Sequence, residues 1–138
     1  MIVVQNPTHF TVVDVWHQRF DAKLLEEVQP LRSILRAGIP VAIGSDGPLN
    51  PYLNLMFACL HPFHPNEALT REEAVIAYTK TSAYAEFKDD KGMLAPGQLA
   101  DVVVLSDDIF TIPLQQLPAT HSVLTMVDGK IVYSTITK

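Results

Sequence analysis

The residue best placed to do chemistry is Asp46, which lies between two glycines directly after a short apolar run. The run Val41–Ile43 lacks the polar alternation of a half-solvated strand, so it predicts a strand buried on both faces. Asp46 would then lie at the carboxyl end of that strand, where α/β proteins place catalytic and binding groups. Gly44 and Gly47 would let the backbone turn sharply and let a ligand approach closely. An Asp-Gly turn that only closes the strand explains the same residues.

The segments before Asp46 predict a strand, a helix and a second strand. Residues 2–5 have strand character, which Pro7 ends. Residues 21–37 repeat apolar positions every three or four residues, as a helix does, and Pro30 should kink it or split off a second piece at residues 31–37. This order is that of a βαβ unit, so the strand at residues 41–44 should run parallel to the first.

The segments after Asp46 change character near Lys91. Residues 50–65 are rich in proline and predict a loop with at most one or two turns of helix. Thr70 and Glu73 have the spacing of a capping box, which should start a helix that runs to about Phe87. Beyond Gly92 we expect three short strands, with a type I′ turn at Asp128-Gly129 between the last two. We therefore predict an α/β part before Lys91 and an antiparallel β part after it.

Several motifs appear in order along the chain. They are QxPTH at residues 5–9, GSDxP at 44–48, EALTxEEA at 67–74, GxLxPGxLADxVVL at 92–105 and TMVxGKIVY at 125–133. Together they resemble the C-terminal part of the amidohydrolase superfamily, most closely the branch that contains the N-substituted formamide deformylases. The long glycine- and proline-containing string is the most specific of the five.

The resemblance implies a fold of the α/β class and a place within it. Members of the superfamily are (β/α)₈ barrels with a small β-sandwich built from both chain ends. Residues 1–91 would supply the last two strands and helices of a barrel. Residues 92–138 would supply the C-terminal portion of the sandwich.

The resemblance also implies roles for two residues. Asp46 matches the aspartate that binds the catalytic divalent metal, zinc by expectation, and that takes a proton from the attacking water and passes it to the leaving nitrogen. His9 would face the same edge and contact a small amide-type substrate, unless it is a loop histidine that caps a turn. The reaction would be hydrolysis of a C–N bond.

The chain departs from the family pattern in its metal ligands. It has no His-x-His pair, and the other strands that carry ligands in the family are not in this sequence. A catalytic metal needs about three protein ligands, so one aspartate cannot hold it. We therefore expect part of a hydrolase that is inactive by itself and needs a missing N-terminal segment. The alternative is a non-catalytic α/β module that self-associates through exposed strand edges.

Other reactive side chains fit structural roles better. His61 and His64 lie in the proline-rich segment and are expected in a solvated loop rather than at a pocket mouth. Asp101 should bond backbone amides at the turn into a strand. Cys59 has an apolar surrounding sequence and is expected to be a buried, inert thiol.

Composition narrows the partners. The formal net charge of −5 and the absence of a basic run argue against nucleic acid and anionic membrane. A single cysteine excludes an internal disulfide and fits the cytoplasm. Hydrophobic residues make up 48% of the chain, and the mean hydropathy is +0.17. These values indicate a globular protein, part of whose apolar surface is covered by something else.

Overall fold

A computed structural model describes residues 1–136 of the chain. Its first sheet is a parallel pair made of β1 (Val3–Gln5) and β2 (Val41–Ile43), in which Val3 faces Val41 and Gln5 faces Ile43. All three residues of β2 are buried. The parallel pairing and the burial of the second strand on both faces are as predicted.

Short helical segments connect β1 to β2. They are the 3₁₀ helix η1 (Pro7–Val12) and the α-helices α1 (Val13–Arg19), α2 (Ala22–Leu25) and α3 (Leu31–Arg36). The predicted split at Pro30 is confirmed, because Pro30 is the N-cap residue of α3. Helices η1 and α1 were not predicted. Pro7, which ends the strand, also begins η1, since its fixed φ suits the first turn of a helix.

The proline-rich segment contains a longer helix than predicted. Helix α4 (Pro51–Leu60) has ten residues, and a 3₁₀ turn, η2 (Pro65–Glu67), follows it. Asn50 caps α4, because its side-chain oxygen accepts hydrogen bonds from the backbone N–H groups of Tyr52 and Leu53. Pro51 occupies the first helical position, where no N–H is needed. The proline therefore starts the helix instead of preventing it.

The capping box predicted at Thr70 and Glu73 is confirmed, with both reciprocal hydrogen bonds in place. It begins α5 (Arg71–Tyr78), and α6 (Lys80–Ala85) follows. The prediction of one helix to about Phe87 was wrong. Thr79 leaves the helical region with φ −120° and ψ −83°, which divides the segment in two.

The second sheet is antiparallel, in the order β3 (Val102–Leu105), β4 (Ser122–Val127) and β5 (Lys130–Ser134). A 3₁₀ helix, η3 (Leu114–Ala119), lies between β3 and β4. Asp128 and Gly129 have φ values of +47° and +74°. Positive φ at both positions is what a type I′ hairpin requires, so the predicted turn is confirmed.

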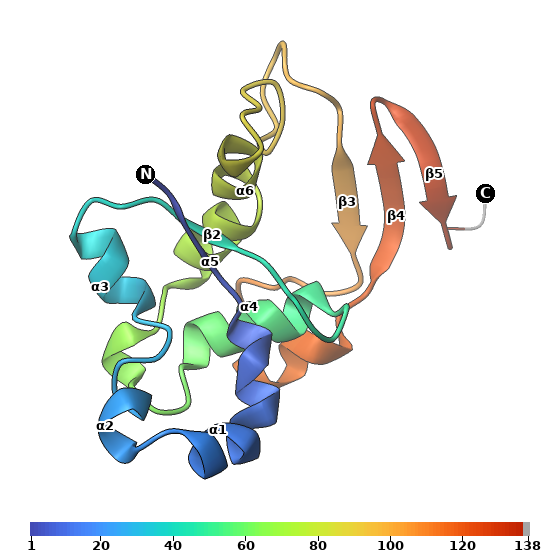
Figure 1. Ribbon diagram of the computed structural model, residues 1–138. Helices are drawn as coiled ribbons and strands as arrows, with labels where there is room; N and C mark the ends of the chain where they lie inside the picture. Colours follow the sequence, from blue (N-terminus) through green and yellow to red (C-terminus); the bar gives the residue numbers. More distant parts are fainter. Residues whose placement is uncertain (137–138) are drawn as a thin grey trace.

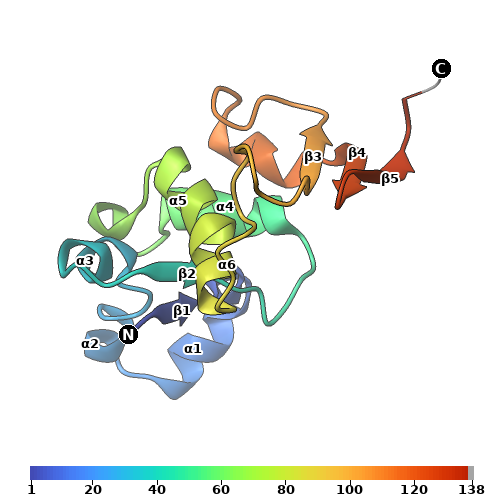
Figure 2. The ribbon, with the colours of Figure 1, turned by 90° about the horizontal axis from the view of Figure 1, so that it is seen from above.

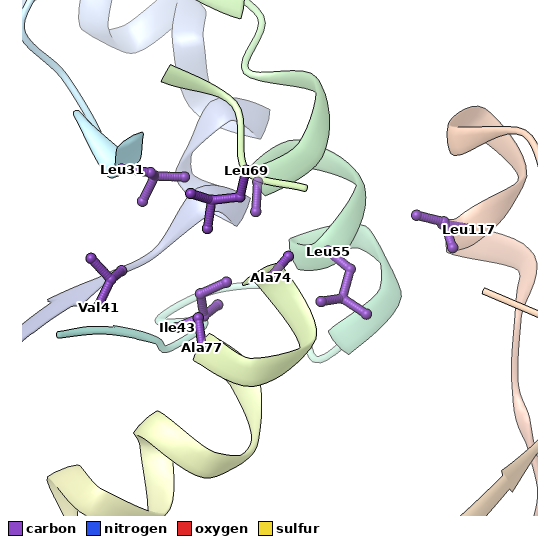
Figure 3. Packing of buried hydrophobic residues seen from close by; sticks show 9 residues of the cluster. Leu31, Val41, Ile43, Leu55, Leu69, Ala74, Ala77 and Leu117 are labelled. Atoms are coloured by element: carbon purple, nitrogen blue, oxygen red, sulfur yellow. The ribbon is translucent and has the colours of Figure 1, made fainter. Parts of the chain in front are cut away.

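The two sheets lie apart, and α5 and α6 separate them (Figure 1). The view from above shows the same arrangement, with β3, β4 and β5 at one end and the β1–β2 pair among the helices (Figure 2). The main core lies around β2, where Val41 and Ile43 meet Leu31, Leu55 and the small residues of α5 (Figure 3). The chain is thus a mixed α/β protein, as predicted. In residues 1–136, no helix has the length and apolar character needed to cross a membrane.

Candidate functional site

Asp46 follows β2 in a turn whose backbone geometry differs from the expected one. The left-handed residue is Asp46 itself, with φ +41°, a conformation that Asp and Asn tolerate better than other side chains. Gly44 and Gly47 do not have positive φ. Gly44 leaves room for the Asn6 side chain, because an added Cβ would lie 2.5 Å from its terminal amide oxygen. The two glycines therefore do not provide the sharp turn that was predicted of them.

The carboxylate of Asp46 is available for interaction. Its side chain is 81% exposed, and within residues 1–136 it pairs with one group, the imidazole of His9. The distance from His9 Nε2 to Asp46 Oδ2 is 3.4 Å. Within residues 1–136, the Asp46 side chain is therefore not occupied by a hydrogen bond to its own turn.

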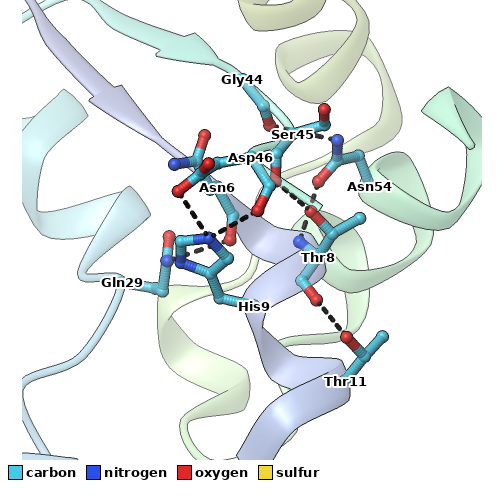
Figure 4. A network of polar contacts seen from close by, with 9 residues as sticks. All are labelled: Asn6, Thr8, His9, Thr11, Gln29, Gly44, Ser45, Asp46 and Asn54. Atoms are coloured by element: carbon cyan, nitrogen blue, oxygen red, sulfur yellow. Dashed lines mark hydrogen bonds and ion pairs between the residues drawn. The ribbon is translucent and has the colours of Figure 1, made fainter. Parts of the chain in front are cut away.

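His9 reaches Asp46 from the neighbouring strand end. It belongs to η1, which starts two residues after β1, and its Nε2 also lies 3.3 Å from the backbone carbonyl oxygen of Asp46. Trp16 packs edge-on against the imidazole, at a ring-centre distance of 6.5 Å. Because β1 and β2 are parallel, their carboxyl ends share one edge, and the structure brings both predicted site residues together there (Figure 4).

The donor set at this edge is small. Carboxylate oxygen and imidazole nitrogen are both common ligands of zinc and related ions. Within the described part of the chain, however, no three His, Cys, Asp or Glu side chains are close enough to hold a metal together. The exposed carboxylate fits a metal site to which further ligands would have to be added.

Two uncharged side chains lie at this edge for which no role was predicted from the sequence. Thr8 and Asn54 are fully buried, and their hydrogen bonds connect the segments that carry His9 and Asp46. Thr8 belongs to the PTH motif, which points to it. No sequence signal marks Asn54, since its segment was expected to be mostly loop.

The expectation that His61 and His64 lie in a solvated loop was wrong. His61 is fully buried, and His64 is half-buried. The ring of His61 packs edge-on against Phe10, its Nε2 is 3.0 Å from the Gln29 carbonyl oxygen, and its Nδ1 accepts the His64 N–H. Burial lowers the pKa of His61. Both ring nitrogens are occupied within the protein, so His61 stabilises the helix end rather than serving a ligand.

The other two reactive side chains have structural surroundings, but only Cys59 has the role that was predicted for it. Partial burial raises the pKa of Cys59 to about 11, which keeps the thiol protonated and unreactive. Asp101 Oδ1 accepts the backbone N–H of Asp128 at 2.8 Å. Asp101 therefore does bond a backbone amide, but that of the distant hairpin turn rather than that of its own turn.

Comparison with known proteins gives a consistent picture. The amidohydrolase family model matches residues 4–133. N-substituted formamide deformylase from Arthrobacter pascens is 31% identical over 114 residues, which cover 75% of this chain and 21% of that protein. The chain thus spans about a fifth of the length of this curated relative.

Solved structures share the fold. A metal-dependent hydrolase from Pyrococcus horikoshii matches 83% of this chain and 26% of its own, with a TM-score of 0.71 and 21% identity. The atrazine chlorohydrolase TrzN from Arthrobacter aurescens, solved with zinc, matches 79% of this chain and 29% of its own, with a TM-score of 0.54 and 24% identity. With the family model matched over nearly the whole described chain, the chain belongs to the amidohydrolase family.

Proposed function

We propose that this chain supplies part of the active site of a metal-dependent hydrolase that cleaves C–N bonds of small amide-type substrates. The observation that carries the proposal is the exposed carboxylate of Asp46 at the carboxyl end of a buried parallel strand, beside His9. Family membership and the hydrolase relatives support the reaction class. The metal-dependent hydrolase and the zinc complex among the structural relatives support a divalent metal.

In this proposal β1 and β2 are the last two strands of a (β/α)₈ barrel, within residues 1–91. Residues 92–138 belong to a β-sandwich, of which residues 137–138 lie outside the described structure. The parallel pairing of β1 with β2 and the separate antiparallel sheet support this division.

Asp46 would be a metal ligand and the proton acceptor. A bound divalent metal would lower the pKa of water and polarise the substrate carbonyl. Asp46 would take the proton of the attacking water on its exposed carboxylate and pass it to the leaving nitrogen, which breaks the C–N bond. His9 would contact the substrate and hold the Asp46 loop through its hydrogen-bond contact with the backbone carbonyl. Because the described residues bring fewer than three possible ligands together, the chain alone should be inactive.

The test is Asp46→Asn in a complete enzyme that contains this chain. Asn adopts the left-handed conformation readily, so the substitution removes the charge while the turn is kept. We expect turnover of N-substituted formamides with added zinc to fall at least about 100-fold. The matched control is Asp128→Asn. Asp128 also has a positive φ and also precedes a glycine, but it lies at the hairpin turn of the other sheet, so this variant should retain turnover. Wild-type turnover in Asp46→Asn would exclude Asp46 from the mechanism.

A second candidate is the self-associating module without catalysis. The exposure of all five residues of β5 favours it, because apolar strand residues in solvent tend to pair with another chain. Sedimentation velocity with thermal unfolding separates the two functions. A defined oligomer with one sharp transition favours the module, and a monomer over the same range of concentrations favours the partial enzyme.

A further inference from the structure

Asn54 connects the two strand ends that carry the proposed site. It lies on α4 and is fully buried. Its side-chain oxygen accepts the Thr8 N–H at 2.8 Å, and its side-chain nitrogen donates to the Gly44 carbonyl at 3.1 Å (Figure 4). Thr8 immediately precedes His9, and Gly44 is two residues before Asp46. One amide group thus bridges the segments after β1 and after β2.

Thr8 makes a second connection in the same place. Its side chain is fully buried, and its hydroxyl donates to the Ser45 carbonyl at 2.7 Å. This bond joins the residue before His9 to the residue before Asp46. We call Asn54 and Thr8 the strand-end clamp.

The clamp acts beyond the point where the sheet can fix these segments. The last ladder pair joins Gln5 to Ile43, and one further bond runs from the Gly44 N–H to the Gln5 carbonyl at 2.9 Å. Past that bond, the clamp and the His9–Asp46 contact itself connect the two loops. The Asn6 side-chain nitrogen can add a hydrogen bond to the Gly44 carbonyl at 3.2 Å. The clamp is therefore placed where it can set the distance between His9 and Asp46.

The chemistry of the clamp fits positioning as well as stability. A buried amide or hydroxyl loses its hydration, and its hydrogen bonds recover only a modest net free energy. An apolar side chain of similar size would fill the same space, but it would leave the Thr8 N–H and the Gly44 carbonyl without this partner. Hydrogen bonds add directionality, because each one holds a specific donor opposite a specific carbonyl oxygen.

We propose that Asn54 and Thr8 are positioning residues that hold His9 beside Asp46. This inference rests on the proposed function of Asp46, and both clamp residues would act through their neighbours, because they are fully buried. Replacing outer residues that orient ligands commonly weakens metal affinity by about 10-fold to 100-fold. A similar loss is expected when the clamp is opened.

The test is nuclear magnetic resonance on the isotope-labelled 138-residue chain without metal. Wild type should show a cross-relaxation signal between the His9 ring and the β protons of Asp46. Thr8→Val has nearly the same shape but lacks the hydroxyl, and the signal should fall at least several-fold. Thr8→Ser keeps the hydroxyl and should restore the signal, which a purely space-filling role would not do.

Asn54→Leu should have the same effect as Thr8→Val. Its matched control is Asn50→Ala, which removes an asparagine cap from the same helix without a bond to either strand end. If Asn54→Leu does not fold, the Thr8→Val and Thr8→Ser pair decides alone. A signal that persists in Thr8→Val, or that is absent from wild type, would overturn the inference.

Turnover of a complete enzyme that contains this chain separates this inference from the proposed function. If Asp46→Asn keeps wild-type turnover while Thr8→Val still loses the His9–Asp46 signal, the role of Asp46 is wrong and the clamp stands. If Asp46→Asn abolishes turnover and Thr8→Val leaves the His9–Asp46 signal unchanged, the clamp is wrong and the role of Asp46 stands.

Discussion

Strands β2 and β5 are both short and largely apolar, but their surroundings differ. Val41, Ala42 and Ile43 of β2 are at most 5% exposed, whereas Ile131 and Val132 of β5 are 60% and 62% exposed. Helices α3, α5 and α6 of this chain pack against β2. The apolar sequence of a strand therefore does not determine whether it is buried; the cover supplied by other elements does.

The difference also locates the surplus apolar surface expected from the composition. Besides β5, residues of β3 and β4 such as Val103 and Val127 are about half exposed. A sheet with apolar residues open to solvent is a region where another polypeptide would gain by binding. Strand β2, with the helices around it, is the covered part of the molecule, and the antiparallel sheet is an uncovered part.

The largest expected effect tests the covered part. Leu31→Ala removes a fully buried side chain from the core beside β2 and should lower the free energy of unfolding by about 2–5 kcal/mol. Ile131→Ala in β5 should change it by about 0.5 kcal/mol or less. Urea unfolding of both variants measures the contrast. Equal losses would mean that the two sheets are equally well covered.

A smaller effect tests the uncovered part. Ile131→Lys places a charge on β5 and should weaken self-association about 10-fold, or about 1.4 kcal/mol. Ile76→Lys on α5 is the matched control, since Ile76 is 50% exposed but lies on a helix. Sedimentation velocity over a range of concentrations measures both. If the two lysine variants associate as wild type does, the exposed sheet is not the contact surface.

The smallest expected effect is a pH dependence of the free energy of unfolding, which comes from the buried side chain of His61. The folded protein holds His61 neutral, and burial lowers its pKa below the ordinary value of 6.5. The unfolded chain therefore binds the proton more readily, and this contribution to stability is present above about pH 6.5 and is lost as the pH falls below it.

The substitution His61→Asn should remove this part of the pH dependence. Asn tolerates the left-handed φ of +40° found at this helix end. His121→Asn, at an exposed position before β4, should leave the dependence unchanged. Urea unfolding at about pH 8 and about pH 5.5 provides the comparison around the ordinary pKa of histidine. An unchanged pH slope in His61→Asn would assign the effect to other groups.

Local signals in the sequence were sufficient for much of the fold. The capping box at Thr70, the split at Pro30 and the hairpin at Asp128-Gly129 were predicted because each depends on residues close in sequence. Helix α4 was underestimated because proline both starts helices and breaks them. Its cap at Asn50 decides between the two, and that role was not recognised.

The site was predictable only in part. The positions of Asp46 and His9 at one edge follow from parallel strands, so the sequence order was enough to bring them together. The burial of His61 depends on Phe10 and Gln29, which are distant in sequence. The clamp residue Asn54 likewise acts through contacts 10 and 46 residues away, which no local pattern encodes.

The peptide bond between Asp46 and Gly47 is exposed to solvent, which makes Asp46 prone to isomerisation. Without a side chain on Gly47, its backbone nitrogen can attack the Asp46 side-chain carbonyl and release water to form a succinimide. Hydrolysis of the succinimide gives either aspartate or isoaspartate. In isoaspartate the main chain continues through the side-chain carboxyl carbon, so the free carboxylate lies in a different position. Asn at position 46 undergoes the same attack with loss of ammonia and so regenerates aspartate over time. Freshly prepared Asp46→Asn protein of verified mass is therefore needed for every assay of that variant.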